Sequence, residues 1–128
     1  MFLGIHHIAI ICSDYARSKA FYCDTLEFTI IAEEFRQERQ SYKLDLKIDE
    51  HTQIELFSFP NAPARPSYPE AQGLRHLAFK VKDVTETKKK LEEKGVCVEE
   101  IRIDETTGKN FTFFADPDGL PIEIYQAG

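Results

Sequence analysis

Several features that mark particular classes of protein are missing from this sequence of 128 residues. No apolar run approaches the roughly 20 residues that a helix needs to span a bilayer, so no membrane-spanning segment is predicted. Acidic residues outnumber lysine and arginine, and a net charge of −6 argues against a nucleic-acid-binding surface, which normally carries a basic patch. The chain starts without the basic segment of a secretory signal, so none is predicted.

Cysteine is also scarce, with three residues in the whole chain. Cys12, Cys23 and Cys97 are odd in number and form no Cys-x-x-Cys pair, which indicates neither a disulfide framework nor a zinc ribbon. A reduced, cytoplasmic setting is therefore expected. With 42% hydrophobic and 30% charged residues, the composition is that of a globular protein long enough to enclose a core.

The most informative feature that is present is an internal repeat. The phrase Gly-Ile-His-His-Ile-Ala-Ile in the first half recurs as Gly-Leu-Arg-His-Leu-Ala-Phe in the second, with His7 and His76 in equivalent places. Each histidine is followed 48 or 47 residues later by a glutamate between aliphatic residues, Glu55 in Ile-Glu-Leu and Glu123 in Ile-Glu-Ile. Four residues matched in this way predict two related halves.

Both halves have the residue pattern of a β-α-β-β-β module, which predicts an α+β fold class. The first half is predicted to contain a strand over 4–12, a helix over 14–25 and strands over 28–32, 41–48 and 52–59. The second half is predicted to contain a strand over 74–82, a helix over 83–94 ended by Gly95, and strands over 97–103, 110–115 and 120–126. Residues 60–73, with four prolines between 60 and 69, are predicted to link a first module over 1–59 to a second over 74–128.

The repeated histidines and glutamates have the chemistry of a metal site. Pairing the halves about a pseudo-two-fold axis would turn His7 and Glu55 toward His76 and Glu123. Two imidazoles and two carboxylates are a mixed donor set suited to Zn²⁺, Ni²⁺, Co²⁺, Fe²⁺ or Mn²⁺. Because four protein ligands leave positions open on a six-coordinate ion for water or substrate, such a site can be catalytic.

A structural interpretation competes with the metal site. Most strand histidines are hydrogen-bonded interior or edge residues, and most strand glutamates face solvent. The recurrence of all four positions in register favours the metal site over four separate coincidences. His6 aligns with Arg75 and is predicted to face the other way, and His51 falls in a predicted turn, so neither is included.

A family resemblance runs along the whole chain. Its motifs are His-Ile-Ala-Ile at 7–10, Gln-Ile-Glu-Leu at 53–56, Gly-Leu-Arg-His-Leu-Ala-Phe at 73–79, and Phe-Phe-Ala-Asp-Pro-Asp-Gly at 113–119 leading to Ile122-Glu123. This set resembles the vicinal oxygen chelate superfamily of glyoxalases, bleomycin-resistance proteins and dioxygenases. More narrowly, it is similar to the small bacterial glyoxalase I-like proteins, often labelled lactoylglutathione lyase.

The resemblance implies a pair of βαβββ modules that form a cupped mixed sheet, with flanking helices, around one divalent metal ion. It implies that His7, Glu55, His76 and Glu123 are the metal ligands. The family's chemistry is bidentate binding of vicinal oxygens to the metal, which stabilises an oxyanion or enediolate. A glutamate held weakly by the ion can then move the proton, with Glu123 the first choice and Glu55 the symmetric alternative. Homodimers are usual in the family, and the modules can pair within one chain or across two.

Two positions argue against glutathione as the thiol. Glyoxalase I enzymes that use glutathione carry an arginine four residues after the first histidine and an asparagine four residues after the first glutamate. This chain has Ile11 and Phe59 at those positions, and an apolar pair cannot hold a charged carboxylate because burying an unpaired charge is costly. A different thiol adduct, a sugar-phosphate-like or hydroxy-keto metabolite, and no turnover at all remain open.

Other residues are weaker candidates for contacts with the substrate. Aromatic side chains on strands expected beside the metal, and basic side chains able to clamp an acidic substrate, are Phe57, Phe59, Phe111, Phe113, Arg75, Arg102 and Lys109. Core packing explains the aromatic residues equally well, and charged strand residues are usually solvated.

The sequence therefore predicts a metal-dependent isomerase or lyase of the glyoxalase type. Its substrate would be a small α-oxo or hydroxy-carbonyl compound, or the thiol adduct of one, transformed by proton abstraction with a metal-stabilised enediolate. The alternatives are a non-catalytic small-molecule binding or resistance protein, a metal-dependent epimerase, and a ring-cleaving dioxygenase that uses Fe²⁺. No nucleic-acid or membrane partner is predicted.

Overall fold

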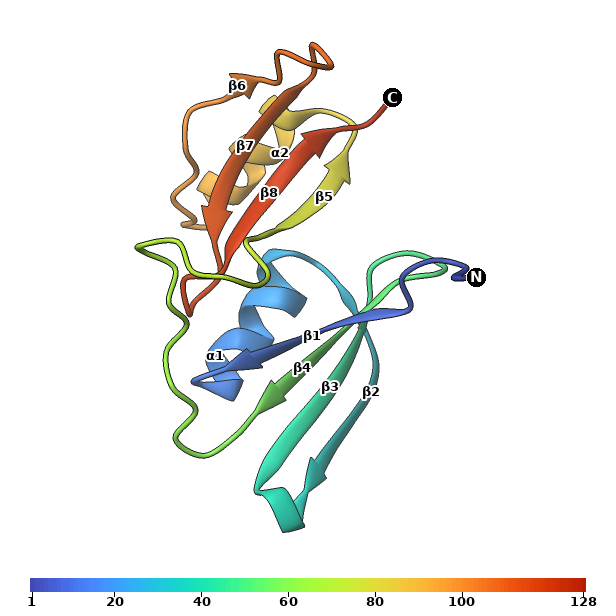
Figure 1. Cartoon of the computed structure of the whole chain (residues 1–128), viewed down its shortest axis with the longest axis vertical. Coiled ribbons are helices and arrows are strands. Elements are labelled where there is room, and N and C mark those ends of the chain that lie inside the picture. The colour runs from blue at the N-terminus through green and yellow to red at the C-terminus, as the bar shows by residue number, and fades with distance from the viewer. The chain divides into compact units, whose positions relative to one another are not determined.

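The computed structural model describes residues 1–128, which divide into two units, residues 1–64 and 65–128. Each unit holds one four-stranded mixed sheet with a helix beside it (Figure 1). The predicted α+β fold of two βαβββ modules is therefore confirmed. Neither unit has a helix with the length and apolar character needed to cross a membrane.

Unit 1 has the strand order β1-β4-β3-β2. Its elements are β1 (His7–Cys12), α1 (Tyr15–Ala20), a π-helical turn (Phe21–Thr25), β2 (Thr29–Arg36), a 3₁₀ turn (Gln37–Arg39), β3 (Ser41–Lys47) and β4 (Gln53–Ser58). Strand β1 is parallel to β4, and the other neighbouring strands are antiparallel. The predicted helix over 14–25 is thus one α-helical segment that continues as a π-helical turn.

Unit 2 repeats this arrangement with the strand order β5-β8-β7-β6. Its elements are β5 (Leu77–Val81), α2 (Val84–Glu93), β6 (Arg102–Ile103), β7 (Asn110–Ala115) and β8 (Pro121–Gln126). Strand β5 is parallel to β8, as β1 is to β4, and β8, β7 and β6 are antiparallel. Residues 60–73, between β4 and β5, form neither a helix nor a strand.

Both helices begin at an aspartate that caps them. The Asp14 carboxylate accepts a hydrogen bond from the Arg17 backbone N–H, and the Asp83 carboxylate accepts one from the Glu86 N–H, each at 3.1 Å. An N-cap side chain satisfies one of the backbone donors that the first helical turn leaves free. Helix α2 ends as predicted before Gly95, whose φ of 88° is the left-handed conformation that glycine adopts without strain.

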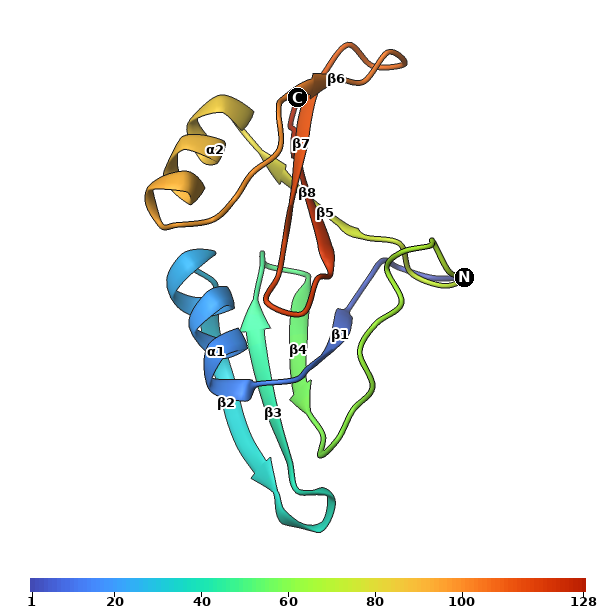
Figure 2. The same cartoon turned by 90° about the vertical axis from the view of Figure 1, so that its left-hand side faces the viewer.

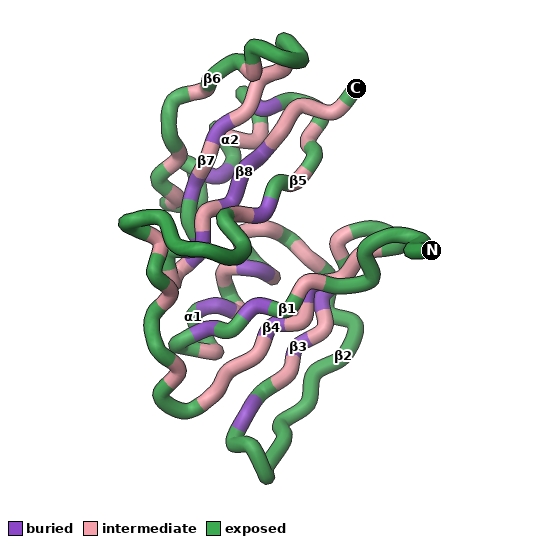
Figure 3. Tube along the Cα trace, viewed as in Figure 1, coloured by how far each residue is buried: buried purple, intermediate pink, exposed green.

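One face of each sheet forms a core against its helix (Figure 2). Because side chains alternate along a strand, every second residue of each strand points toward the helix. The most deeply buried apolar side chains of the two sheets are Cys12, Leu44, Leu46, Ile54 and Leu56 in unit 1, and Ile122 and Ile124 in unit 2. Figure 3 shows these buried positions along β3, β4 and β8. The opposite face, which we call the open face, carries the histidines and glutamates.

The largest difference from the predicted elements is in residues 97–103, of which only Arg102–Ile103 form a strand. The backbone before β6 makes one bond to β7, from the Glu99 N–H to the Phe113 carbonyl at 2.9 Å, and its carbonyls accept hydrogen bonds from side chains. The Lys88 ammonium donates to the carbonyls of Val98 and Glu99, both at 3.2 Å. The Thr112 hydroxyl donates to the carbonyls of Glu99 and Glu100, at 2.8 and 3.1 Å. These side-chain donors satisfy carbonyls that a strand ladder would otherwise have to pair.

Candidate metal site and substrate pocket

The first histidine–glutamate pair lies on the open face of unit 1. Ala9 of β1 is opposite Glu55 of β4, and His7 is two residues before Ala9, so that its side chain is on the same face as Glu55. The Nδ1 atom of His7 is 3.4 Å from Oε2 of Glu55. The imidazole is 41% exposed and the carboxylate 15% exposed. The structure therefore brings His7 and Glu55 together within this unit.

The second pair repeats the first. Ala78 of β5 is opposite Glu123 of β8, and His76 is again two residues before the alanine. The Nε2 atom of His76 is 3.5 Å from Oε2 of Glu123, and the two side chains are 28% and 11% exposed. His76 itself directly precedes β5 instead of lying within the strand. The two parallel strand pairs thus place a histidine and a glutamate in the same relative position.

The donor atoms and spacings of the two pairs are compatible with a divalent ion. An N···O distance of 3.4 or 3.5 Å is long for a hydrogen bond. Two donor atoms at about 2.1 Å from the same ion lie roughly 3 to 3.4 Å apart, depending on whether the geometry is octahedral or tetrahedral. The donors, imidazole nitrogen and carboxylate oxygen, are those that Zn²⁺, Ni²⁺, Co²⁺, Fe²⁺ and Mn²⁺ accept.

The His76 ring also lacks the hydrogen bond expected of a structural histidine. Its Nδ1 atom is buried and has no hydrogen-bond partner. An unpaired buried polar atom is rare and costs free energy. The site as described is nevertheless made of pairs, because no group of three or more histidine, cysteine or acidic side chains gathers in a metal-binding arrangement.

His6 is closer to the first pair than the sequence predicts. Its Nδ1 atom is 3.0 Å from Nδ1 of His7, and the two rings meet edge to face. His6 precedes the start of β1 at His7, so strict strand alternation does not set its direction. His51 is exposed in a turn, as predicted.

Charged and aromatic residues surround Glu55. The Lys43 ammonium is 2.7 Å from Asp45 and 4.0 Å from Glu55, and all three side chains are less than one-fifth exposed. Two predicted substrate contacts, Phe57 and Phe59, stack on each other with ring centroids 5.9 Å apart. A lysine ammonium therefore lies close to the Glu55 carboxylate.

Aromatic rings and an arginine surround Glu123. Phe113 is opposite Glu123 in the β7–β8 register, and its ring meets the His76 ring edge to face at 5.0 Å. The Arg102 guanidinium lies over the rings of Phe111 and Phe113, at 5.1 and 5.5 Å from their centroids. A guanidinium over an aromatic face is held by the electron density of the ring.

A polar cluster that the sequence did not indicate fixes the loop between β6 and β7 to the open face. The Tyr125 hydroxyl, two residues beyond Glu123, donates to the Asp104 carboxylate at 2.8 Å and also contacts the Thr107 hydroxyl. The hydrogen bond from Tyr125 and then that from the Thr106 N–H hold the pKa of Asp104 below its usual value. Lys109, a predicted clamp, contributes its backbone carbonyl to this loop by accepting from the Asp104 N–H.

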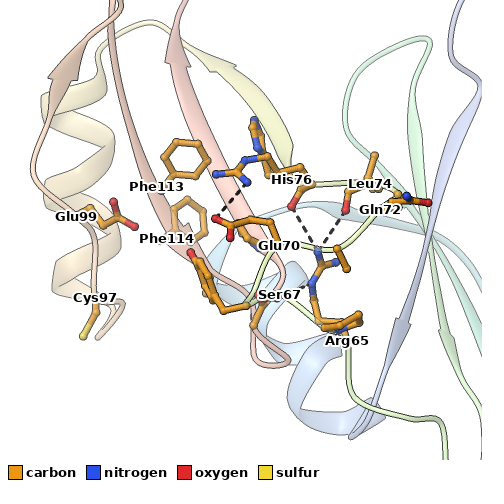
Figure 4. A pocket seen from close by; sticks show the side chains of 18 of the residues that line it. Arg65, Ser67, Glu70, Gln72, Leu74, His76, Cys97, Glu99, Phe113 and Phe114 are labelled. Atoms are coloured by element: carbon orange, nitrogen blue, oxygen red, sulfur yellow. Dashed lines mark hydrogen bonds and ion pairs between the residues drawn. The ribbon is translucent and has the colours of Figure 1, made fainter.

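Unit 2 contains a pocket of about 640 Å³ beside His76. Figure 4 shows His76 and Phe113 at one side of it, with Arg65, Ser67 and Glu70 on the segment that precedes β5. Three of the residues predicted to contact substrate line this pocket, namely Arg75, Arg102 and Phe113. Phe57, Phe59 and Lys109 do not line it.

Residues 65–73 belong to the segment that the sequence predicts to be a linker, and the sequence does not indicate their contribution to the pocket. The Arg65 guanidinium donates to the Ser67 hydroxyl at 2.7 Å and to the carbonyls of Leu74 and Arg75 at 3.3 and 3.5 Å. The Ser67 hydroxyl in turn donates to the Gly119 carbonyl at 3.2 Å. These bonds fold the proline-rich segment against the start of β8.

Comparison with known proteins places this fold in a family. Residues 4–124 match the family model of the Glyoxalase/Bleomycin resistance protein/Dioxygenase superfamily. YwkD, an uncharacterized protein of Bacillus subtilis, is 58% identical over 123 residues, which are 96% of each chain.

Two solved structures agree with this match. A glyoxalase family protein from Enterococcus faecalis is 49% identical and superposes with a TM-score of 0.91 over 98% of both chains. The glyoxalase I of Leishmania major, described as trypanothione-dependent, is 26% identical with a TM-score of 0.75, over 96% of this chain and 86% of that one. The chain therefore belongs to the glyoxalase, bleomycin-resistance and dioxygenase superfamily.

Proposed function

We propose that this protein is a metal-dependent lyase or isomerase of the glyoxalase type. Its substrate would be a small α-oxo or hydroxy-carbonyl compound, or the thiol adduct of one. The observation that carries the proposal is the duplicated pair: His7 with Glu55, and His76 with Glu123, stand in the same strand register in two separate units. Duplication of a sheet alone does not require that its polar open-face residues be kept as histidine and glutamate.

In this proposal the four side chains His7, Glu55, His76 and Glu123 hold one divalent ion, Ni²⁺, Zn²⁺, Mn²⁺, Co²⁺ or Fe²⁺. The ion, when bound, would supply a Lewis acid that stabilises negative charge on a substrate oxygen, which is worth several kcal/mol. The long N···O distances in both pairs support this role. A homodimer, usual in the family, is part of the same proposal and is tested by sedimentation.

Glu123 is the proposed base. It would take a proton from the carbon beside the carbonyl group and return it to the neighbouring carbon, so that the carboxylate is regenerated at the end of each turnover. Its side chain is 11% exposed and has Phe113 across the strand pair. The Glu55 carboxylate instead has the Lys43 ammonium at 4.0 Å. This cation competes with the substrate C–H group for a place beside the carboxylate oxygens. Glu55 is therefore the second choice for this role.

The thiol, if one is used, is proposed to differ from glutathione. Ile11 is 54% exposed on the open face of unit 1 and offers no hydrogen bond. The ring of Phe59 is covered by the Arg39 guanidinium, 4.8 Å from its centroid. The trypanothione-dependent enzyme of Leishmania major is a precedent for another thiol on this fold. Robust turnover of the methylglyoxal–glutathione hemithioacetal would overturn this part of the proposal.

Metal analysis of the purified protein tests the ligand set directly. We expect His7→Ala, His76→Ala and Glu123→Gln each to reduce the bound divalent metal severely, because each removes a ligand. His51→Ala is the matched control, since it removes an exposed histidine from a turn and should leave the metal content unchanged. Undiminished metal in both His76→Ala and Glu123→Gln would contradict the proposal.

An activity screen then separates catalysis from binding alone. Thiol adducts and α-hydroxy-carbonyl compounds would be supplied with each metal in turn, and product formation followed by NMR in deuterated water. Deuterium in the product at the carbon next to the carbonyl is expected from proton removal and return. Tight binding of a compound without turnover by any metal form would instead indicate a small-molecule binding protein.

A further inference from the structure

The pocket in unit 2 has a positive balance of charge in an acidic protein. The whole chain has a net charge of −6. The pocket, however, is lined by three arginines, Arg65, Arg75 and Arg102, and by two glutamates, Glu70 and Glu99. Arg65 donates to a hydroxyl and to two backbone carbonyls, and none of these three acceptors carries a charge that would neutralise the guanidinium. The pocket therefore has one more guanidinium than carboxylate, besides the imidazole of His76.

The other two arginines have only loose carboxylate partners. Arg102 is 3.3 Å from Glu99, and Arg75 is 3.8 Å from Glu70. All four side chains are more than half exposed. Exposed ion pairs of this kind contribute at most about 1 kcal/mol, so an anion that reached the guanidinium groups could replace the glutamates at little cost.

Arg102 is also held in one place. Its guanidinium rests over Phe111 and Phe113, and the same Phe113 ring contacts the His76 imidazole. One phenyl ring therefore separates a positioned cation from the His76–Glu123 pair. A guanidinium that is fixed before binding loses less conformational entropy when it forms a bidentate bond with an anion.

We propose that this pocket selects substrates that carry an anionic group, a carboxylate or a phosphate, bound by Arg102 with Arg75. The body of the substrate would lie against Phe113, with its carbonyl group toward His76 and Glu123. The position of the carbonyl group rests on the proposed function, whereas the anion site rests on the pocket itself.

Matched acid and neutral probes test the anion site. The carboxylate arm compares benzoylformate with its methyl ester, and the phosphate arm compares dihydroxyacetone phosphate with dihydroxyacetone, each titrated by calorimetry. We expect wild type to bind at least one anionic probe about tenfold more tightly than its neutral partner, the value of a charge-assisted hydrogen bond. Arg102→Gln should abolish that preference while leaving the neutral probe within about twofold.

A control in the other unit removes the same charge from a similar setting. Arg39 lies over Phe59 as Arg102 lies over Phe113, so Arg39→Gln changes the net charge equally and removes a comparable cation–ring contact. This variant should keep the preference for the anionic probe. Thermal unfolding of both variants would show that each is folded, which is expected because the Arg102 side chain is 52% exposed.

The titrations are run on metal-loaded and on chelator-treated protein, which separates this inference from the proposed function. A preference for the anion that survives chelation and depends on Arg102 supports the pocket even if no metal is ever found. A preference that disappears with the metal and is unaffected by Arg102→Gln overturns the pocket and leaves the metal site standing. Equal binding of acid and neutral probes, or no binding of any anionic probe, also overturns it.

Discussion

The open faces of the two sheets carry the same histidine–glutamate pair in different surroundings. In unit 1, Lys43 and Asp45 form an ion pair beside Glu55. In unit 2, the residue opposite Glu123 is Phe113, and a positioned arginine covers its ring. Asp45 is opposite Glu55 in the same way that Phe113 is opposite Glu123, so an acidic residue in one unit corresponds to an aromatic residue in the other.

This difference indicates how two units with the same strand register can have different roles. The strand register is common to both units because parallel pairing fixes which side chains share a face. The neighbours of the pair are not fixed by the register and differ freely. In the proposed function, unit 1 would contribute ligands only, whereas unit 2 would contribute ligands, the base and the contacts that select the substrate.

The largest expected effect tests this asymmetry in turnover. Glu123→Gln should lower kcat by about a thousandfold, since loss of a general base typically costs 10² to 10⁴. Glu55→Gln should lower it less when metal is in excess, because that residue is proposed to be only a ligand. Single-turnover rates at saturating metal measure both variants. Equal losses would show that the two glutamates act alike and that the asymmetry of their neighbours has no catalytic meaning.

The next effect tests what the units share. Ile54→Ala in unit 1 and Ile122→Ala in unit 2 each remove a fully buried side chain from a central strand. Each should lower the free energy of unfolding by about 3 kcal/mol, through lost burial and the cavity left behind. Urea unfolding followed by circular dichroism provides the measurement. A large difference between the two variants would mean that the cores are less alike than their burial suggests.

The repeat and the two cores could be predicted from the sequence because both depend on the local alternation of apolar and polar residues along a strand. Buried Ile54 and Leu56 flank Glu55, and buried Ile122 and Ile124 flank Glu123, so the pattern gave both the strands and the shared face. The helices predicted to begin at residues 14 and 83 depend on equally local signals, since an N-terminal cap acts within three residues.

The pocket could not be predicted from the sequence because it depends on contacts between residues that are far apart in the chain. Prolines around Arg65 indicate a linker, and only the folded chain shows its guanidinium bonded to the Leu74 carbonyl and Ser67 bonded to Gly119. The missing strand before β6 has a similar cause, since Lys88 and Thr112 reach its carbonyls from other elements. Such long side-chain bonds leave no periodic signal in the sequence.

A smaller effect is expected at the helix caps, where the units are most alike. Asp14→Ala and Asp83→Ala each remove a side-chain acceptor that binds a backbone N–H at 3.1 Å. Each should lower the free energy of unfolding by about 1 kcal/mol. The asparagine variants, which retain the acceptor, are the controls and should lose less. If Asp83→Ala alone were destabilising, the two helices would not contribute equally to their units.

The smallest effect concerns a contact that links α1 to β2 in unit 1. The Lys19 ammonium donates to Glu33 at 2.8 Å, and the Tyr15 hydroxyl also donates to that carboxylate. These two bonds, that from Lys19 first, lower the pKa of Glu33. A carboxylate with a lowered pKa stabilises the folded state at neutral pH, and that stabilisation is lost as the pH falls through the folded pKa, below the value of an unfolded glutamate.

Glu33→Gln should therefore be slightly less stable than wild type at neutral pH, and the two should converge as the pH falls through the lowered pKa of Glu33. The urea midpoints of both proteins, compared across that range, measure the convergence. Glu34→Gln is the neighbouring control, because Glu34 pairs with Arg36 while both side chains are about half exposed, so its loss should change the neutral midpoint less. A gap between wild type and Glu33→Gln that stayed constant down to acid pH would show that the contact between α1 and β2 does not depend on the charge of Glu33.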